Sequence, residues 1–132
     1  MAQPAKLPPD PLAELAARAR ADALAAEAVA SAVPDLATLA TEVAKARGEH
    51  AIALQHEIDR ARPPKASTAA PTTDISTAPA PSASPAAKAS LLDALTAAER
   101  QAAELIASVP RHRAGLLGSV AAGCACLREV LG

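Results

Sequence analysis

The chain has 132 residues, with 13 basic and 14 acidic side chains and a formal net charge of −1. It holds 39 alanines and no Phe, Tyr or Trp, so helices are strongly favoured and any core must come from Leu, Val, Ile and Ala. The lack of a basic patch and of aromatic stacking platforms argues against nucleic-acid binding.

The first predicted helix follows a short proline-rich N-terminus. Residues 1–9 contain three prolines and no long apolar run, so we expect them to be disordered and not to form an export signal. Asp10 is predicted to be the N-cap, with Pro11 in the first helical position. A helical stripe then reaches Pro34, which ends the helix, and comprises Leu12, Leu15, Ala19, Ala26, Val29 and Val33.

A second helix is predicted from the N-cap candidate Asp35 to about Arg62, where two prolines stop it. Its stripe comprises Leu36, Leu39, Val43, Arg47, His50, Leu54 and Ile58. Because only a few residues connect the two helices, they should be antiparallel neighbours, and residues 10–62 form one helical hairpin.

Residues 63–87 are predicted to be a disordered linker rich in Pro and Ala. Ser and Thr make up most of the rest, and Ile75 is the one large apolar side chain in this stretch. Such a segment cannot bury enough surface to offset the entropy of ordering it.

Residues 88–132 are predicted to form a second hairpin. Ser90 opens its first helix, with Asp93 three residues on in a near capping-box pattern, and Pro110 breaks it. The last helix is predicted from Arg111 to Leu131. The two stripes are Leu91, Leu95, Ala98, Ala102, Leu105 and Val109, then Leu117, Val120, Cys124, Leu127 and Leu131.

The two halves share a short sequence at the break between their helices. Ala30–Pro34 reads ASAVP and Ala107–Pro110 reads ASVP, which indicates an internal duplication of a helical hairpin. A hairpin alone cannot cover its apolar stripe. The fold class predicted is therefore all-α, two antiparallel helical hairpins that pack into a four-helix bundle.

Residues 111–124 imitate a lipoprotein signal, because a basic start precedes an apolar run and small residues before Cys124. Such signals lie at the N-terminus, so we interpret this segment as a buried fourth helix. No stretch reaches the roughly 18–20 apolar residues of a membrane span, and we expect none in this chain.

His50 lies on the inward stripe of its helix, where four-helix bundles can hold paired metal ions through Glu-x-x-His motifs. The residues three before His50, His56 and His112 are not carboxylates, so that motif is absent. We expect His50 to be an internal or bundle-end histidine bonded to a polar neighbour, with a metal role as the alternative.

Asp22 and Arg47 fall near the stripes of the first two helices and could approach each other as a partly buried pair that sets the register. Cys124 is expected on the packed face and Cys126 on the opposite one. A single Cys-x-Cys pair is a weak sign of a soft-metal site, so we interpret Cys124 as a small buried side chain.

No phosphate-binding loop and no nucleophile elbow is present, so the sequence predicts neither catalytic nor cofactor or metal residues, and no enzyme. The leading hypothesis is a non-enzymatic interaction or structural module that pairs with a helical partner or with itself. The alternatives are a degenerate ferritin-like metal-binding bundle and an envelope lipoprotein.

The chain resembles alanine-rich actinobacterial proteins of mycobacterial type in residues 10–15 and 19–23, in the proline-rich spacer and in residues 114–122. That group includes lipoproteins of unknown function and is related to ferritin-like bundles. Members of that group carry an N-terminal export signal with a lipid-attached cysteine, whereas this chain starts where the mature part would begin. We therefore expect a cytoplasmic protein as written, or a cell-envelope lipoprotein if the true start lies upstream. The resemblance implies no activity.

Overall fold

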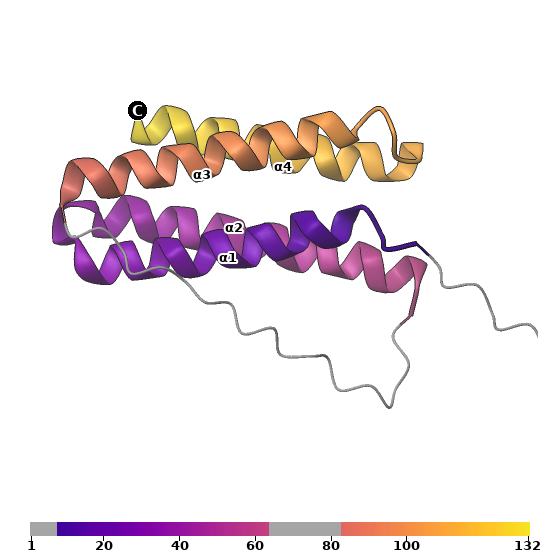
Figure 1. The fold of residues 1–132 in the computed structure, drawn as a ribbon, viewed down its shortest axis with the longest axis horizontal. Coiled ribbons are helices and arrows are strands. Elements are labelled where there is room, and N and C mark those ends of the chain that lie inside the picture. Colours follow the sequence, from indigo (N-terminus) through magenta and orange to yellow (C-terminus); the bar gives the residue numbers. More distant parts are fainter. Residues whose placement is uncertain (1–7, 64–82) are drawn as a thin grey trace, which may run out of the picture.

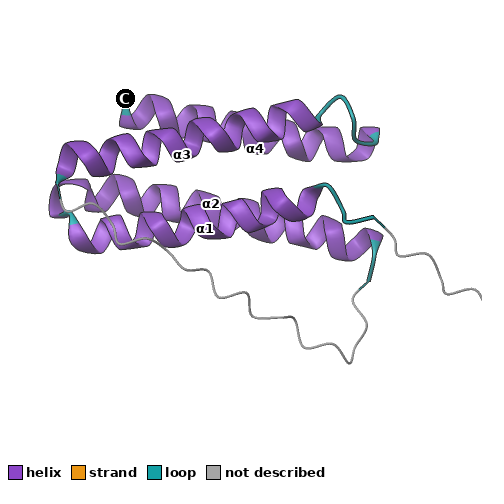
Figure 2. Cartoon of the chain, viewed as in Figure 1, coloured by secondary structure: helices purple, strands orange, loops and turns teal. Residues whose placement is uncertain are grey.

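A computed structural model describes residues 8–63 and 83–132, and these residues form helices and turns without any strand (Figures 1 and 2). The predicted disorder of residues 1–7 and 64–82 lies outside the described residues. The all-α fold of two helical hairpins is confirmed. Its elements are α1 (Leu12–Ala32), the 3-10 turn η1 (Pro34–Leu36), α2 (Ala37–Ala61), α3 (Ser84–Leu105) and α4 (Arg111–Leu131).

α1 starts at Leu12, one residue later than predicted, with Pro11 just before it, but Asp10 satisfies the first turn as predicted. The Asp10 carboxylate accepts a hydrogen bond from the Leu12 backbone N–H at 2.9 Å, which satisfies one of the free donors of the first turn. The predicted cap at Asp35 is wrong, because no side chain caps α2. Pro34 instead opens the 3-10 turn η1, and this turn buries Leu36 and reverses the chain into α2.

α3 begins earlier than predicted. It starts at Ser84, so residues 84–87 belong to the helix and not to the linker, and Ser90 lies inside it. Pro85 occupies the first turn, where proline has no intrahelical hydrogen bond to lose. Ala87 is fully buried one turn before Leu91, so packing extends the helix back to this point.

α3 ends at Leu105, five residues before Pro110. The Leu105 carbonyl accepts hydrogen bonds from the backbone N–H groups of Ser108 and Val109, at 3.0 and 3.2 Å. It also accepts one from the Ser108 hydroxyl at 3.1 Å. These contacts satisfy the free carbonyl of the last turn, so the helix is closed by Ser108, before the break that was predicted at Pro110.

Every pair of adjacent helices in the bundle is antiparallel. α1 packs against α2 and α3 against α4, and the second hairpin lies on the first with α1 beside α3 and α2 beside α4. Figure 1 shows that α1 and α4 run in one direction and that α2 and α3 run in the other. The start of α4 therefore meets the start of α1 and the end of α2.

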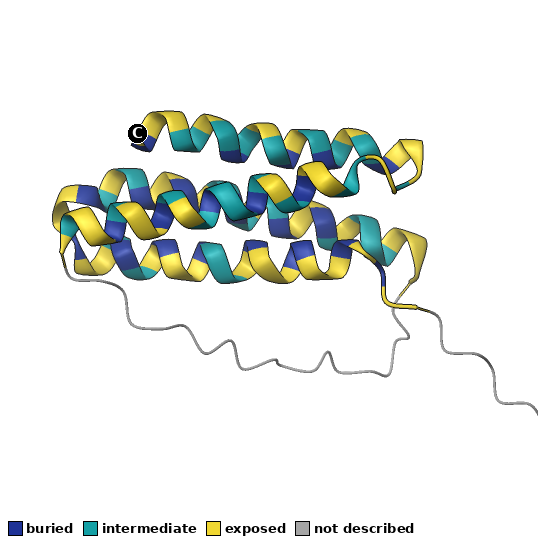
Figure 3. Cartoon of the chain, turned by 45° about the horizontal axis from the view of Figure 1, so that its top comes forward, coloured by how far each residue is buried: buried dark blue, intermediate teal, exposed yellow. Residues whose placement is uncertain are grey.

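Buried residues lie on all four helices (Figure 3). They include most of the predicted stripes, but six residues of those stripes are only half-buried: Leu39, His50, Ile58, Leu105, Val109 and Leu127. Much of the core is alanine, and α1 alone buries Ala16, Ala19, Ala23 and Ala26. Small side chains let helix backbones approach closely, but a buried alanine removes less apolar surface from water than a leucine. We therefore expect the few buried polar contacts to contribute more than usual to the alignment of the two hairpins.

Candidate functional site

Arg47 lies in the middle of the bundle and is only 1% exposed. Its Nε and Nη2 each lie 3.1 Å from Asp22 Oδ2, so the predicted approach of these two residues is confirmed. Its Nη1 donates to His50 at 2.9 Å and to the Cys124 sulfur at 3.6 Å. One guanidinium thus joins α1, α2 and α4, and all three of its nitrogens have partners.

The contact with Arg47 fixes the protonation of His50. A guanidinium only donates, so the imidazole Nδ1 must accept and the proton of the neutral ring must sit on Nε2. The Nε2 edge of the ring faces Gly123, where a Cβ would come within 2.9 Å of it. Gly123 therefore provides the space for His50, and the histidine is the internal, bonded residue that the sequence predicted.

Burial shifts the pKa values of the other groups around Arg47. Desolvation raises the pKa of the Asp22 carboxyl above its usual value and outweighs the opposing pull of Arg47. Desolvation, then the Arg47 charge, lowers the pKa of His50, with Glu49 opposing. Desolvation also raises the pKa of the Cys124 thiol. A buried thiol of this kind is a poor nucleophile, so the cluster stabilises the fold rather than activating a reagent.

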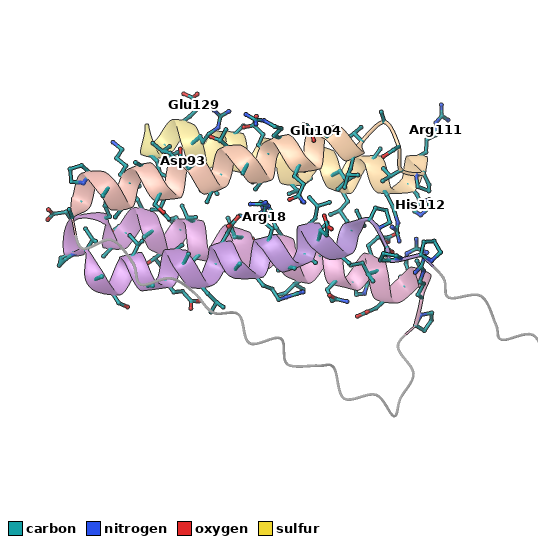
Figure 4. All side chains as sticks on the ribbon, in the orientation of Figure 1. Arg18, Asp93, Glu104, Arg111, His112 and Glu129 are labelled. Carbon is teal, nitrogen blue, oxygen red and sulfur yellow. The ribbon has the colours of Figure 1, made fainter. Side chains whose placement is uncertain are left out.

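A second polar cluster closes the end of the bundle, and the sequence analysis missed it. Arg113 on α4 donates to both Asp10 carboxylate oxygens, at 2.7 and 2.9 Å, and its Nε donates to Glu57 of α2 at 3.1 Å. Its spacing of four from Leu117 places it on the buried stripe of α4, and this periodicity could have revealed it. Figure 4 shows its neighbours Arg111 and His112 at that end of the bundle.

The carboxylates of this end cluster are held in the charged state. The hydrogen bond from Arg113 is the main reason why the pKa of Asp10 is lowered. The bond from Arg60, followed by that from Arg113, lowers the pKa of Glu57 to about 2. Lowered carboxyl pKa values stabilise the fold above the unfolded values near 4, and this contribution is lost as the pH falls through the folded values.

Of the other candidate residues, His112 lies with its Nε2 3.4 Å from Glu57 in the end cluster, whereas the cysteines and His56 are not brought together. Cys126 is exposed and Cys124 is buried, as expected, and both thiols are free. His56 is exposed on α2. Across residues 8–63 and 83–132, no group of three His, Cys, Asp or Glu side chains could hold a metal ion.

An apolar groove runs along the outside of the first hairpin, between α1 and α2. Its central hollow has a volume of about 430 Å³ and an almost entirely apolar surface, with Ala23 and Ala51 as its floor. The walls carry Leu24, which is 43% exposed, and Ile52, which is 72% exposed. This face points away from the second hairpin, because Arg18 on the other side of α1 reaches Gln101 of α3 (Figure 4).

A neighbouring hollow at the same seam extends the groove. It is lined by Glu27 and Ser31 of α1 and by Thr41 and Lys45 of α2, over the alanines between them. From residue 20 to residue 31, α1 rises about 17 Å at 1.5 Å per residue. We call this surface, between residues 20–31 and 41–55, the outer groove. It is long enough for about three helical turns.

α4 passes the test of length and hydropathy for a membrane-spanning helix, although we expected no segment of the chain to pass it. It is long and apolar enough to cross a membrane, with a mean hydropathy of 1.4 in its most apolar stretch. In the structure α4 packs as the fourth helix of the bundle, but only 22% of its most apolar stretch is buried, so the prediction of a buried helix holds for its inward side chains alone. The location of the protein therefore stays a prediction.

Replacing Gly123 by Ala should displace the His50 ring. The added methyl group would gain the helix propensity of alanine, worth up to about 1 kcal/mol, but would disturb a hydrogen bond to a charged donor worth about 1.5–3 kcal/mol. We expect Gly123→Ala to lower the free energy of unfolding by about 1 kcal/mol, measured by urea denaturation with circular dichroism.

Gly118→Ala is the matched control, because a Cβ at this position on the same helix meets nothing within 4 Å. It should stabilise the protein by up to about 1 kcal/mol. Equal stabilisation by both variants would contradict the packing of His50 against Gly123.

The stability of the protein should fall as the pH drops below about 6.5 because of His50. A histidine whose pKa is lower in the folded state stabilises the fold above the unfolded value, and that contribution is lost as the pH falls toward the folded value. His50→Asn keeps an acceptor near Nδ1 but does not titrate. The difference in unfolding free energy between wild type and this variant should therefore shrink from neutral to mildly acidic pH, and a constant difference would refute the role of His50.

Comparisons of the sequence and the structure with protein-family models, with curated proteins and with solved structures found no significant match. The resemblance to alanine-rich actinobacterial proteins therefore stays a prediction. Function has to be argued from the residues themselves.

Proposed function

We propose that this chain is a non-enzymatic helical interaction module whose outer groove binds an α-helix of a partner. The main support for this proposal is the position of the exposed apolar side chains. The large apolar side chains that stand exposed in the described parts of the chain are Leu24, Ile52 and Val130, and the first two lie on opposite walls of one apolar groove. Two exposed apolar side chains that face each other across a hollow offer anchor positions for the apolar face of a partner helix.

The polar clusters support a structural rather than a catalytic use of the interior. Arg47 and Arg113 are buried and bonded to residues of the bundle itself. Cys124, the buried thiol, has a raised pKa, the opposite of what a nucleophile needs. The interior thus holds the helices in place, which leaves recognition to the surface. Within the described residues, the outer groove is the hollow whose walls carry exposed large apolar side chains, Leu24 and Ile52.

The metal-binding alternative rests on the four-helix architecture alone, and the envelope alternative rests on the sequence resemblance. Neither has a supporting contact among the described residues. We therefore keep the interaction module as the single proposal.

Site-specific photo-crosslinking in cells that naturally make the protein tests this proposal. A photoreactive residue in place of Ile52 should crosslink to a helical segment of one polypeptide, identified by mass spectrometry. Adding Leu24→Glu, which charges the facing wall, should reduce that product at least tenfold.

A photoreactive residue in place of Val130 is the matched control, because Val130 is 64% exposed but lies on α4, outside the groove. Position 130 should not give the same product. The proposal fails if no product forms from position 52, or if both positions crosslink alike.

A further inference from the structure

The outer groove carries a projection and a hollow side by side on α2. Ile52 is the most exposed of the large apolar side chains that the structure describes. Gly48 lies one turn before it on the same helix face, and a Cβ added there would meet nothing within 4 Å. The exposed Ile52 side chain thus lies next to the open space over Gly48, and both residues line the apolar hollow of the outer groove.

An antiparallel meeting of two identical α2 helices would match these features. In a two-fold contact, residue i of one copy faces residue j of the other, and j faces i. With the axis near position 50, each Ile52 enters the space over Gly48 of the other copy. The same axis places Lys45 opposite Gln55, so no like charges face each other on α2.

The charges of the α1 wall fit the same arrangement. Arg20, Leu24 and Glu27 follow one another on one face of α1, since their spacings are four and three residues. The antiparallel contact places Arg20 of each copy opposite Glu27 of the other and brings the two Leu24 side chains near the axis. Opposite charges then flank an apolar centre on both sides, which favours this orientation over one with like charges in contact.

We propose that the helix-bearing partner of the outer groove is a second copy of this chain, packed antiparallel with Ile52 over Gly48 and Arg20 opposite Glu27. This inference rests on the proposed function, because it assumes that the groove binds helices. To the proposed function it adds the identity of the partner, a second copy, and the antiparallel direction of the partner's helices.

Sedimentation equilibrium of the full chain from about 1 μM to about 1 mM, the range of weak interfaces, tests the proposal. The wild type should be in monomer–dimer equilibrium. Ile52→Glu should raise the dimer Kd at least tenfold, since it places a carboxylate in the apolar centre. Val130→Glu, the exposed control on α4, should leave the dimer Kd unchanged.

Gly48→Leu is a second variant, chosen because a Cβ added at position 48 meets nothing within 4 Å in its own copy. It should favour the helix and still weaken the dimer at least tenfold by filling the hollow. Circular dichroism of each variant verifies that the bundle remains folded.

A charge exchange tests the two-fold arrangement itself. Arg20→Glu should weaken the dimer severalfold, because it sets two carboxylates face to face at both ends of the contact. Adding Glu27→Arg to the same chain should restore the affinity, since the opposite charges then face each other again. This rescue is expected only if residue 20 of one copy meets residue 27 of another.

A chain that stays monomeric up to about 1 mM, or a dimer insensitive to Ile52→Glu and Gly48→Leu, overturns the proposal. Failure of the charge exchange to rescue the dimer overturns the antiparallel arrangement. If the chain is monomeric but position 52 crosslinks to a different protein in cells, the proposed function survives and only the identity of the partner is wrong.

Discussion

The buried guanidinium of Arg47 is the contact on which the alignment of α1, α2 and α4 depends. Alanine stripes pack in several registers at similar cost, because neighbouring alanines offer nearly identical surfaces. A charge in the core has far fewer acceptable positions, since each unpaired donor would cost free energy. Asp22 on α1, His50 on α2 and Cys124 on α4 surround Arg47 in one alignment of the helices.

The end cluster around Arg113 repeats this arrangement at a second level of the bundle. In the end cluster, Asp10 just before α1 meets Arg113 of α4. In the central cluster, Asp22 of α1 and Cys124 of α4 both contact Arg47. Helix geometry places the two levels about 17 Å apart. Two polar contacts at this separation fix both the sliding and the tilt of the second hairpin against the first.

The apolar patterns predicted most of the fold because they are local. Helical periodicity and the prolines placed the four helices, and most residues of the inward stripes lie in the observed core, which also holds alanines outside those stripes. The start of α3 was missed because Pro85 was interpreted as a linker residue, whereas it occupies the first turn of a helix. That choice depends on the burial of Ala87, a tertiary effect that composition does not reveal.

The sites were less predictable. The pairing of Asp22 with Arg47 followed from their places on adjacent stripes of one hairpin. The link between Arg113 and Asp10 joins two hairpins across 103 residues, and no local pattern connects them. The outer groove also required the structure, since Gly48 and Ile52 matter there through empty space and exposure. α2 thus presents Arg47 to the core and the adjacent Gly48 to the outer surface.

A double-mutant cycle of Asp22 and Arg47 tests the central role of this buried pair most directly. We expect Asp22→Leu, which leaves the guanidinium unpaired in the core, to lower the free energy of unfolding by about 3–5 kcal/mol. Adding Arg47→Met should recover at least half of that loss, because a buried pair replaced by apolar side chains is close to neutral. Losses that simply add in the double variant would contradict the account.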